Sequence, residues 1–513
     1  MIRFNRTNNF SKTYLFGIGN RILLLLIPFV IRTIIIKEIG VEYVGLTGLF
    51  TSILTFFSLT ELGISSAISF SLYRPIANNR INRINALLAT MKRLYNYIGL
   101  IILIAGLALL PFIDYLIKDA NRTDINIKCL YLIYLANTCV TYFGFAYKTV
   151  LFEAYQEGYN NHIIDSAMEI GKGVVQILIL IFFKNFYYFA LVLPVASITK
   201  NIATEILSNK KHPELQPRGK ISKRQRIILQ NKVMYLGLHS IASKLTLSFD
   251  NIIISHFIGL IAIANYNNYL LIYNAVFGLI IVFYNALKPI IGNSFHVDKT
   301  DKRFEFFKLG DLMSNWICTW FATCILCLIQ PFIVLWLGKD YLLDFYSVIF
   351  LVLFFYSNGI RQFYSTVYVG VKGYWNKTLF RQILSCVSNL FLNIILVQKY
   401  GIKGIIFSSF ITNLAISCPL DIKLVYTKII QKNVIDACKA VSKDFTIFFI
   451  TAAITLFICV TIKENSLCLF AVRLFICAII PNLILFAIYR NTHEFIYIRE
   501  RALKVLNKIK SNH

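Results

Sequence analysis

Apolar stretches of about 20 residues recur from one end of this 513-residue chain to the other. A helix of that length crosses the ~30 Å hydrocarbon core of a bilayer. No water is available there to satisfy backbone N–H and C=O groups, so a series of such stretches folds as a helical bundle. The sequence therefore predicts an all-α polytopic membrane protein.

Fourteen spans account for these stretches. Only 15% of the residues are charged, whereas soluble domains carry about 25%, and the connections are too short to hold a soluble domain. The expected spans cover residues 14–36, 45–72, 94–113, 127–148, 162–183, 186–208, 229–258, 261–287, 309–337, 345–371, 378–398, 403–427, 445–462 and 467–489.

The chain is strongly basic, with 52 Lys and Arg against 25 Asp and Glu and a net charge of +27. If both termini are cytoplasmic, 32 of the basic residues fall in cytoplasmic segments and 7 in outer loops. Cytoplasmic loops carry such an excess. We therefore expect a multi-pass inner-membrane protein with both termini in the cytoplasm. The basic residues are spread over short connections, which gives no support to nucleic-acid binding.

Three short matches at nearly one offset indicate an internal repeat of six spans. The paired segments are Ile39-Gly40 with Ile258-Gly259, Arg74-Pro75 with Lys288-Pro289, and 156–161 with 371–376. Parallel repeats of this kind imply two lobes around a central cavity and transport by alternating access. The expected parts are an N-lobe of six spans, a basic cytoplasmic linker, a C-lobe of six spans, two extra spans and a basic cytoplasmic tail: 1–209, 210–228, 229–430, 431–490 and 491–513.

The segment from Arg32 to Asn78 resembles the N-terminal signature of bacterial polysaccharide flippases, within the multidrug/oligosaccharidyl-lipid/polysaccharide exporter superfamily. The residues that carry the likeness are Ile39-Gly40, Tyr43-Val44-Gly45-Leu46, Glu61-Leu62-Gly63-Ile64 and Leu72-Tyr73 before Pro75. The fourteen spans and the twofold repeat extend the likeness over the whole chain.

The resemblance implies a V-shaped bundle that moves an undecaprenyl-pyrophosphate-linked oligosaccharide, such as an O-antigen or capsule repeat unit, from the cytoplasmic to the outer leaflet. It implies no cofactor. The expected partners are the lipid-linked glycan, the bilayer, a coupling H⁺ or Na⁺, and the polysaccharide polymerase and chain-length regulator.

Cations inside spans are costly unless they face a hydrated cavity or a partner, so they are the first candidates for binding an anionic diphosphate. The alternative is that those near span ends extend to the headgroups, which applies most to Arg32. The candidate substrate-binding residues are Arg21, Arg32, Lys172, Lys200, Lys244 and Arg361.

Buried titratable groups are candidates for ion coupling, and the alternative for each is a helix–helix contact or a structural ion pair. Asp165, Glu169, Lys172 and Gln176 share one helical face, with Glu169 and Lys172 as mutual counter-ions. The candidate coupling residues are Glu61, Glu169, Asp250 and His239.

The sequence predicts neither an enzyme nor a metal site. There is no P-loop or zincin motif, and no long loop carries paired carboxylates. Cys324 and Cys327 form a C-x-x-C inside an apolar run without a second ligand pair. We expect these cysteines to act as small apolar packing residues.

Three other functions compete with a repeat-unit flippase. A drug or cation antiporter of the same superfamily should have an acidic cavity, whereas the ionisable residues within these spans are more cationic. A membrane glycan polymerase predicts a large outer loop and no internal repeat. A lipid II flippase of the same superfamily stays open.

Overall fold

The computed structural model describes residues 23, 26–58, 64–118, 126–144, 146–155, 157–223, 226–227, 229, 248–297, 300–369, 375–462 and 466–500. Within these ranges every regular element is a helix, and no strand is present. The predicted all-α fold is therefore confirmed.

Each of the fourteen predicted spans contains a described helix. Residues 26–38 and 248–257 are helical in the first and seventh spans. Within the described part of the chain, eight continuous helical segments are long and apolar enough to cross a membrane, and α2 and α5 are shorter apolar helices. The main helices are α2 (Val41–Phe57), α3 (Ile64–Ala77), α4 (Ile81–Leu109), α5 (Ile127–Val140), α7 (Tyr159–Phe182), α8 (Phe186–Lys211), α10 (Leu260–Val297), α11 (Thr300–Trp336), α12 (Phe345–Gln362), α14 (Trp375–Tyr400), α15 (Ile402–Thr412), α16 (Cys418–Leu424), α17 (Val434–Val460) and α18 (Leu467–Tyr489).

Five of these helices begin after a residue whose side chain accepts a hydrogen bond from a first-turn backbone N–H. Asn, Asp and Ser do this well because a short side-chain oxygen reaches the unpaired donors of the first turn. These N-cap residues explain where each of the five helices begins. They are Asn126 for α5, Asn185 for α8, Asp344 for α12, Asn433 for α17 and Ser466 for α18.

Several predicted boundaries are wrong, and α4 at Ile81 and α17 at Val434 both begin before the predicted starts of 94 and 445. The connection expected at 288–308 is largely helical, because α10 continues to Val297 and α11 begins at Thr300. Hydropathy finds the apolar window of a helix, whereas polar turns can extend the same helix beyond the bilayer. The fourth span is shorter than predicted, since α5 ends at Val140 and is followed by a turn and two short helices, Ala146–Lys148 and Thr149–Ala154.

The internal repeat is visible in the positions at which helices begin. Three helices of the first half whose first residues follow a described connection have counterparts displaced by 216 to 219 positions, and the pairs are α2 with α10, α5 with α12 and α8 with α15. The preceding glycines also match. Gly40 and Gly259 have φ angles of 140° and 129°, which side chains rarely adopt. Each ends a helix by donating its N–H to a carbonyl five residues earlier, Ile35 at 2.9 Å and Ile254 at 3.0 Å.

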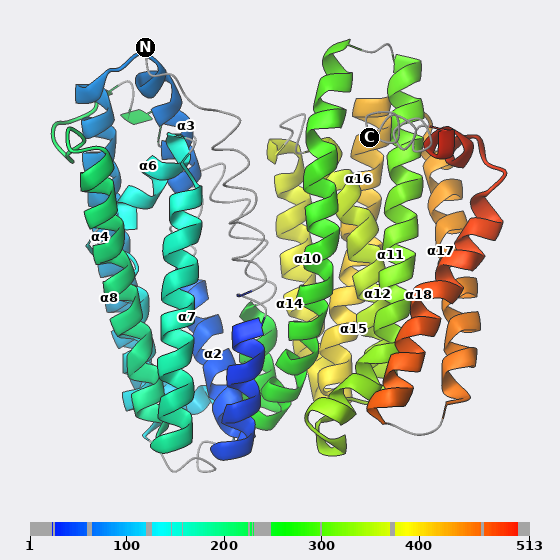
Figure 1. The fold of residues 1–513 in the computed structure, drawn as a ribbon, viewed down its shortest axis with the longest axis horizontal. Helices are drawn as coiled ribbons and strands as arrows, with labels where there is room; N and C mark the ends of the chain where they lie inside the picture. Colours follow the sequence, from blue (N-terminus) through cyan, green and yellow to red (C-terminus); the bar gives the residue numbers. More distant parts are fainter. Residues whose placement is uncertain are drawn as a thin grey trace, which may run out of the picture. The chain divides into compact units, whose positions relative to one another are not determined.

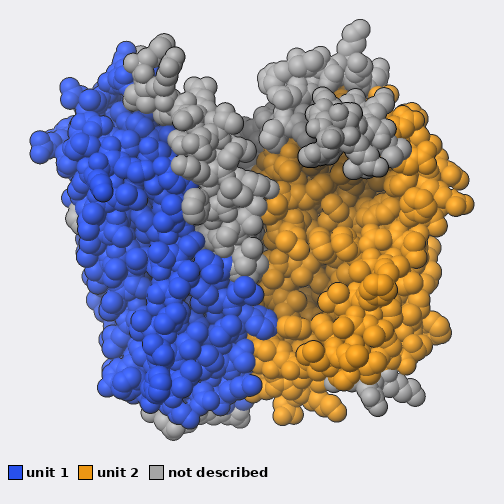
Figure 2. Space-filling view, in the orientation of Figure 1, with its two compact units in different colours: residues 1–264 blue, residues 265–513 orange. Residues whose placement is uncertain are grey.

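The chain forms two compact units, residues 1–264 and 265–513 (Figure 2). In unit 1, α8 packs against α5 and α7, and α7 and α8 run side by side (Figure 1). In unit 2, α11 packs against α12, α17 and α18. The predicted division into lobes, linker, extra spans and tail stays a prediction, as does the predicted central cavity.

Candidate substrate-binding site

Six of the ten predicted site residues are described by the structure. Arg21, Glu61, His239 and Lys244 lie outside the described residues. Four of the six described residues belong to two ionic clusters. One cluster lies in each compact unit. The remaining two are Arg32, which is half-buried, and Asp250, which is 1% exposed.

The α7–α8 cluster in unit 1 consists of Asp165, Glu169, Lys172 and Lys200. Both carboxylate oxygens of Glu169 lie 2.7 Å from Lys172 Nζ, so the predicted counter-ion pair is confirmed. Asp165 instead pairs across to α8, where Lys200 Nζ lies 2.7 Å from its Oδ1. The predicted polar face of α7 is thus joined to α8 by an ion pair that the sequence did not reveal.

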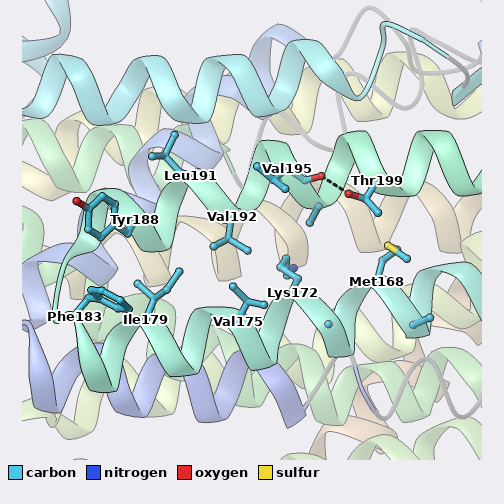
Figure 3. Close-up of a pocket in the computed structure, with 13 residues that line it drawn as sticks. Met168, Lys172, Val175, Ile179, Phe183, Tyr188, Leu191, Val192, Val195 and Thr199 are labelled. Carbon is cyan, nitrogen blue, oxygen red and sulfur yellow. Dashed lines mark hydrogen bonds between the residues drawn. The ribbon is translucent and has the colours of Figure 1, made fainter.

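An apolar groove runs along α7 and α8 beside this cluster. Its volume is about 750 Å³, and its walls are mainly aliphatic and aromatic, with Val175, Ile179, Val192 and Val195 among them. Lys172 lines the groove and is its one charged residue (Figure 3). A smaller polar pocket of about 370 Å³ shares Lys172 and contains the rest of the α7–α8 cluster. The apolar groove and the polar pocket therefore meet at Lys172.

The Arg–Asp–Arg cluster in unit 2 consists of Arg361 on α12, Arg381 on α14 and Asp421 on α16. Arg381 Nε lies 2.8 Å from Asp421 Oδ1, and Arg361 Nη1 lies 3.6 Å from Oδ2. The Asp421 side chain is fully buried and that of Arg381 is 5% exposed, whereas that of Arg361 retains 17% exposure. Two guanidinium groups thus share one carboxylate, which leaves a formal charge of +1.

Three π-helical segments lie beside this cluster in the chain. One begins two residues after Arg361, and the other two flank α16, which carries Asp421. These segments are Phe363–Val369, Asn413–Ser417 and Val425–Ile430. π-Helical turns are rare and occur frequently at functional sites. Their presence distinguishes the Arg–Asp–Arg cluster from an ordinary packing contact between regular helices.

Polar neighbours hold Arg361 in place. Its Nη2 donates to Asn358 Oδ1 at 2.8 Å, and Asn358 Nδ2 donates in turn to the Tyr273 hydroxyl at 3.1 Å. Asn358 is on the same helix as Arg361, and Tyr273 is on α10. The guanidinium is therefore held by Asp421, by Asn358 and, through Asn358, by Tyr273. A fixed, planar guanidinium with spare N–H donors suits the bidentate recognition of phosphate or carboxylate oxygens.

Sequence reasoning identified Arg361 but missed Arg381 and Asp421. Both fall inside predicted spans, and a charge inside a span was the available signal. Their pairing, however, depends on the packing of α14 against the segment that contains α16. Residue spacing along a single helix does not reveal such a contact.

Comparisons with known proteins agree with this architecture. The sequence profile of the family described as "Polysaccharide biosynthesis protein" matches residues 14–295. A search of curated proteins found no match. Among solved structures, the lipid II flippase MurJ in an inward closed conformation is 18% identical, with a TM-score of 0.70 over 93% of this chain and 99% of that chain.

Multidrug transporters share the fold. An inward-facing multidrug resistance MATE family transporter of the MOP superfamily is 14% identical, with a TM-score of 0.57 over 76% of this chain and 92% of that chain. A Vibrio cholerae MATE transporter is 13% identical, with a TM-score of 0.56 over 83% of this chain and 99% of that chain. The family profile covers more than half of the sequence, and the helices fold as in these transporters. The chain therefore belongs to the family described as polysaccharide biosynthesis protein.

Proposed function

We propose that this protein is a flippase that moves an undecaprenyl-pyrophosphate-linked oligosaccharide repeat unit from the cytoplasmic to the outer leaflet of the inner membrane. The Arg–Asp–Arg cluster carries the proposal. Its surplus positive charge lies within helices that cross an apolar medium, where an unpaired charge is costly. A diphosphate supplies the missing negative charge, so the cluster favours an anionic substrate over a cationic one.

Arg361 makes the first contact with the diphosphate. It is the more exposed of the two arginines, while Arg381 stays against Asp421. Arg21, Arg32, Lys172, Lys200 and Lys244 remain further candidates for the path of the headgroup. Lys172 is well placed for a lipid substrate, because it lines both the apolar groove and the polar pocket of unit 1.

Transport energy is proposed to come from an H⁺ or Na⁺ gradient. Glu169 and Asp250 are the described candidates for the coupling carboxylate, and Glu61 and His239 are the others. Both termini are proposed to lie in the cytoplasm, which the charge asymmetry of the connections supports. The polysaccharide polymerase and chain-length regulator are the proposed partners that receive the flipped glycan.

A lipid II flippase is the second candidate function, favoured by the likeness to MurJ over nearly the full length of both chains. Lipid II also carries a diphosphate, so the Arg–Asp–Arg cluster suits either substrate. Rescue of cells depleted of their lipid II flippase separates the two candidates. Rescue there, without restored display of a surface polysaccharide in a repeat-unit flippase mutant, would select lipid II as the substrate.

Complementation of a repeat-unit flippase mutant tests the proposal directly. Arg361→Ala should lose most surface-glycan display, and Arg361→Lys should keep part of it, because lysine retains the charge but not the bidentate fork. Arg490→Ala, at an exposed arginine after α18, is the matched control and should display glycan normally. Normal display by Arg361→Ala at normal protein level would contradict the proposed role of the cluster.

A further inference from the structure

Three cysteine thiols meet inside unit 2. Cys327 on α11, Cys459 on α17 and Cys477 on α18 have their Sγ atoms within 4.8 Å of one another. The Cys459 and Cys477 sulfurs are 3.8 Å apart. All three residues are buried, at 5%, 4% and 0% exposure. Cys327, Cys459 and Cys477 are called the thiol cluster below.

The sequence expectation of simple packing rested on Cys327 and its C-x-x-C neighbour Cys324. The structure directs these two side chains differently. Cys324 Sγ lies 3.5 Å from the backbone oxygen of Cys477, whereas Cys327 joins the thiols of two other helices. The partners of Cys327 are Cys459 and Cys477, which are far away in the sequence. No spacing motif therefore predicts the cluster.

We propose that the thiol cluster binds one copper(I) ion. Soft thiolate sulfurs select Cu(I), zinc and iron–sulfur clusters among biological metals. Structural zinc sites take four protein ligands in a tetrahedron, and iron–sulfur clusters also take four cysteines. The thiol cluster supplies three sulfurs from three helices, and Leu328, Leu456, Ile476 and Cys324 pack against it. The Cys324 thiol lies against the Cys477 carbonyl and is not one of the three grouped sulfurs, so the cluster matches a three-coordinate soft ion.

The separations suit such an ion. With metal–sulfur bonds of about 2.3 Å, three sulfurs around one ion lie roughly 4 Å apart in a plane. The observed 3.8 Å between Cys459 and Cys477 is already close to that value, and the other separations stay within 4.8 Å. Small changes in side-chain torsion angles would close the triangle without movement of the helices.

A buried cation lies close enough to offset the charge of bound thiolates. Arg473 is on α18, one turn before Cys477, and is 6% exposed. α18 packs against α17, which carries Cys459. Binding releases the three thiol protons, and a Cu(I) ion held by three thiolates has a charge of −2, which the Arg473 guanidinium partly neutralises. Burial of the loaded site is then less costly than burial of an isolated charge.

Copper binding would tie the α17–α18 hairpin to α11. Trp316 and Trp320 of α11 already contact α18, through hydrogen bonds to the Asn482 side chain and the Cys477 carbonyl. The thiol cluster joins the end of α17, which stops one residue after Cys459, to the middle of α18, where Cys477 is the eleventh of 23 residues. The ion would therefore fasten both helices to α11, and an ion that binds only the folded state raises stability.

The test uses full-length protein in detergent micelles, with the exposed cysteines Cys129, Cys438 and Cys468 replaced by serine in every sample. Copper is added as Cu(I) under anaerobic, reducing conditions. Competition with a chromogenic Cu(I) chelator gives the number of ions retained per chain. The variants are Cys459→Ser and Cys477→Ser, and Cys139→Ser is the control at a buried thiol of unit 1.

The parent and Cys139→Ser should each retain one Cu(I) and unfold at a higher temperature when loaded. Both cluster variants should lose the ion and the thermal shift. If a serine variant elutes as an aggregate, Cys327→Ala provides the same comparison. The proposal is overturned if the parent retains no copper, if Cys477→Ser retains as much as the parent, or if zinc displaces copper at equal concentration. A Cys459–Cys477 disulfide whose reduction leaves no copper binding would also overturn it.

Discussion

Arg381 Nε lies 2.8 Å from Asp421 Oδ1, and both side chains are almost completely withdrawn from solvent. Loss of one member of a buried ion pair leaves a charge without compensation, which costs about 3–5 kcal/mol. Asp421→Asn should therefore lower the free energy of unfolding substantially, because both arginines lose their counter-ion. The measurement is the thermal unfolding of purified protein in detergent.

The matched comparison is the double variant Arg381→Met/Asp421→Asn. It removes one cation together with the carboxylate, so it should unfold at a higher temperature than Asp421→Asn alone. Equal or lower stability of the double variant would show that Arg381 and Asp421 are not energetically coupled.

Gly45 on α2 sets how closely the chain at Leu260 can approach. A Cβ atom at Gly45 would lie 2.3 Å from the Leu260 carbonyl oxygen, a backbone atom that cannot turn aside. Gly45→Ala should therefore destabilise the protein despite the higher helix propensity of alanine. Gly171 on α7 has open space at the same position, so Gly171→Ala should be neutral or stabilising by up to about 1 kcal/mol. Thermal unfolding of the two variants decides, and equal effects would contradict the close approach.

Glu157 gives one part of unit 1 a pH-dependent stability. It lies between the fourth and fifth predicted spans, and its Oε2 is 3.6 Å from both His212 Nε2 and Lys211 Nζ. The imidazole of His212, aided by Lys211, holds the pKa of Glu157 below its ordinary value of 4.5. Because the pKa of Glu157 is lower in the folded state, its charge contributes to stability in full at pH values above the ordinary pKa. This contribution disappears as the pH falls through the folded-state pKa.

Glu157→Gln should therefore unfold at a lower temperature than wild type at neutral pH. The difference should shrink as the pH falls below about 4.5. The comparison is a series of unfolding curves for both proteins over that range. A difference that stays constant with pH would assign the effect to packing instead of charge.

The predicted topology can be read with cysteines that the chain already has. Cys129 and Cys468 are exposed and lie at the starts of α5 and α18, on the outer side in the predicted topology. Cys438 is exposed near the start of α17, on the cytoplasmic side. A membrane-impermeant maleimide added to intact cells should label the first two and leave Cys438 unlabelled until the membrane is opened. The reverse pattern would mean that the topology is inverted.

Much of the fold could be predicted because hydropathy and glycine positions act locally. Long apolar windows located the fourteen spans. Gly40 and Gly259 marked equivalent helix ends, where the backbone has a positive φ angle that favours glycine. Helix ends were predicted less well, since polar residues such as those beyond Lys288 continue α10 outside the apolar window.

The two ionic clusters could be predicted only in part from the sequence, for a different reason. Arg361 was identified because a charge inside an apolar span needs an explanation, and Glu169 and Lys172 because they share a helix face. The contacts of Arg381 with Asp421 and of Lys200 with Asp165 join separate helices. Such pairings are fixed by tertiary packing, which the spacing of residues along one helix does not determine.

The most direct test of the account is whether the purified protein prefers a lipid diphosphate through Arg361. Undecaprenyl pyrophosphate and undecaprenyl monophosphate are offered together, and bound lipid is quantified by native mass spectrometry. Wild-type protein should retain the diphosphate in excess, because a second phosphate adds charge-assisted hydrogen bonds to the guanidinium. Arg361→Gln should lose that preference while still binding both lipids through their shared isoprenoid chain. An unchanged preference in Arg361→Gln would contradict the assignment of the Arg–Asp–Arg cluster as the diphosphate site.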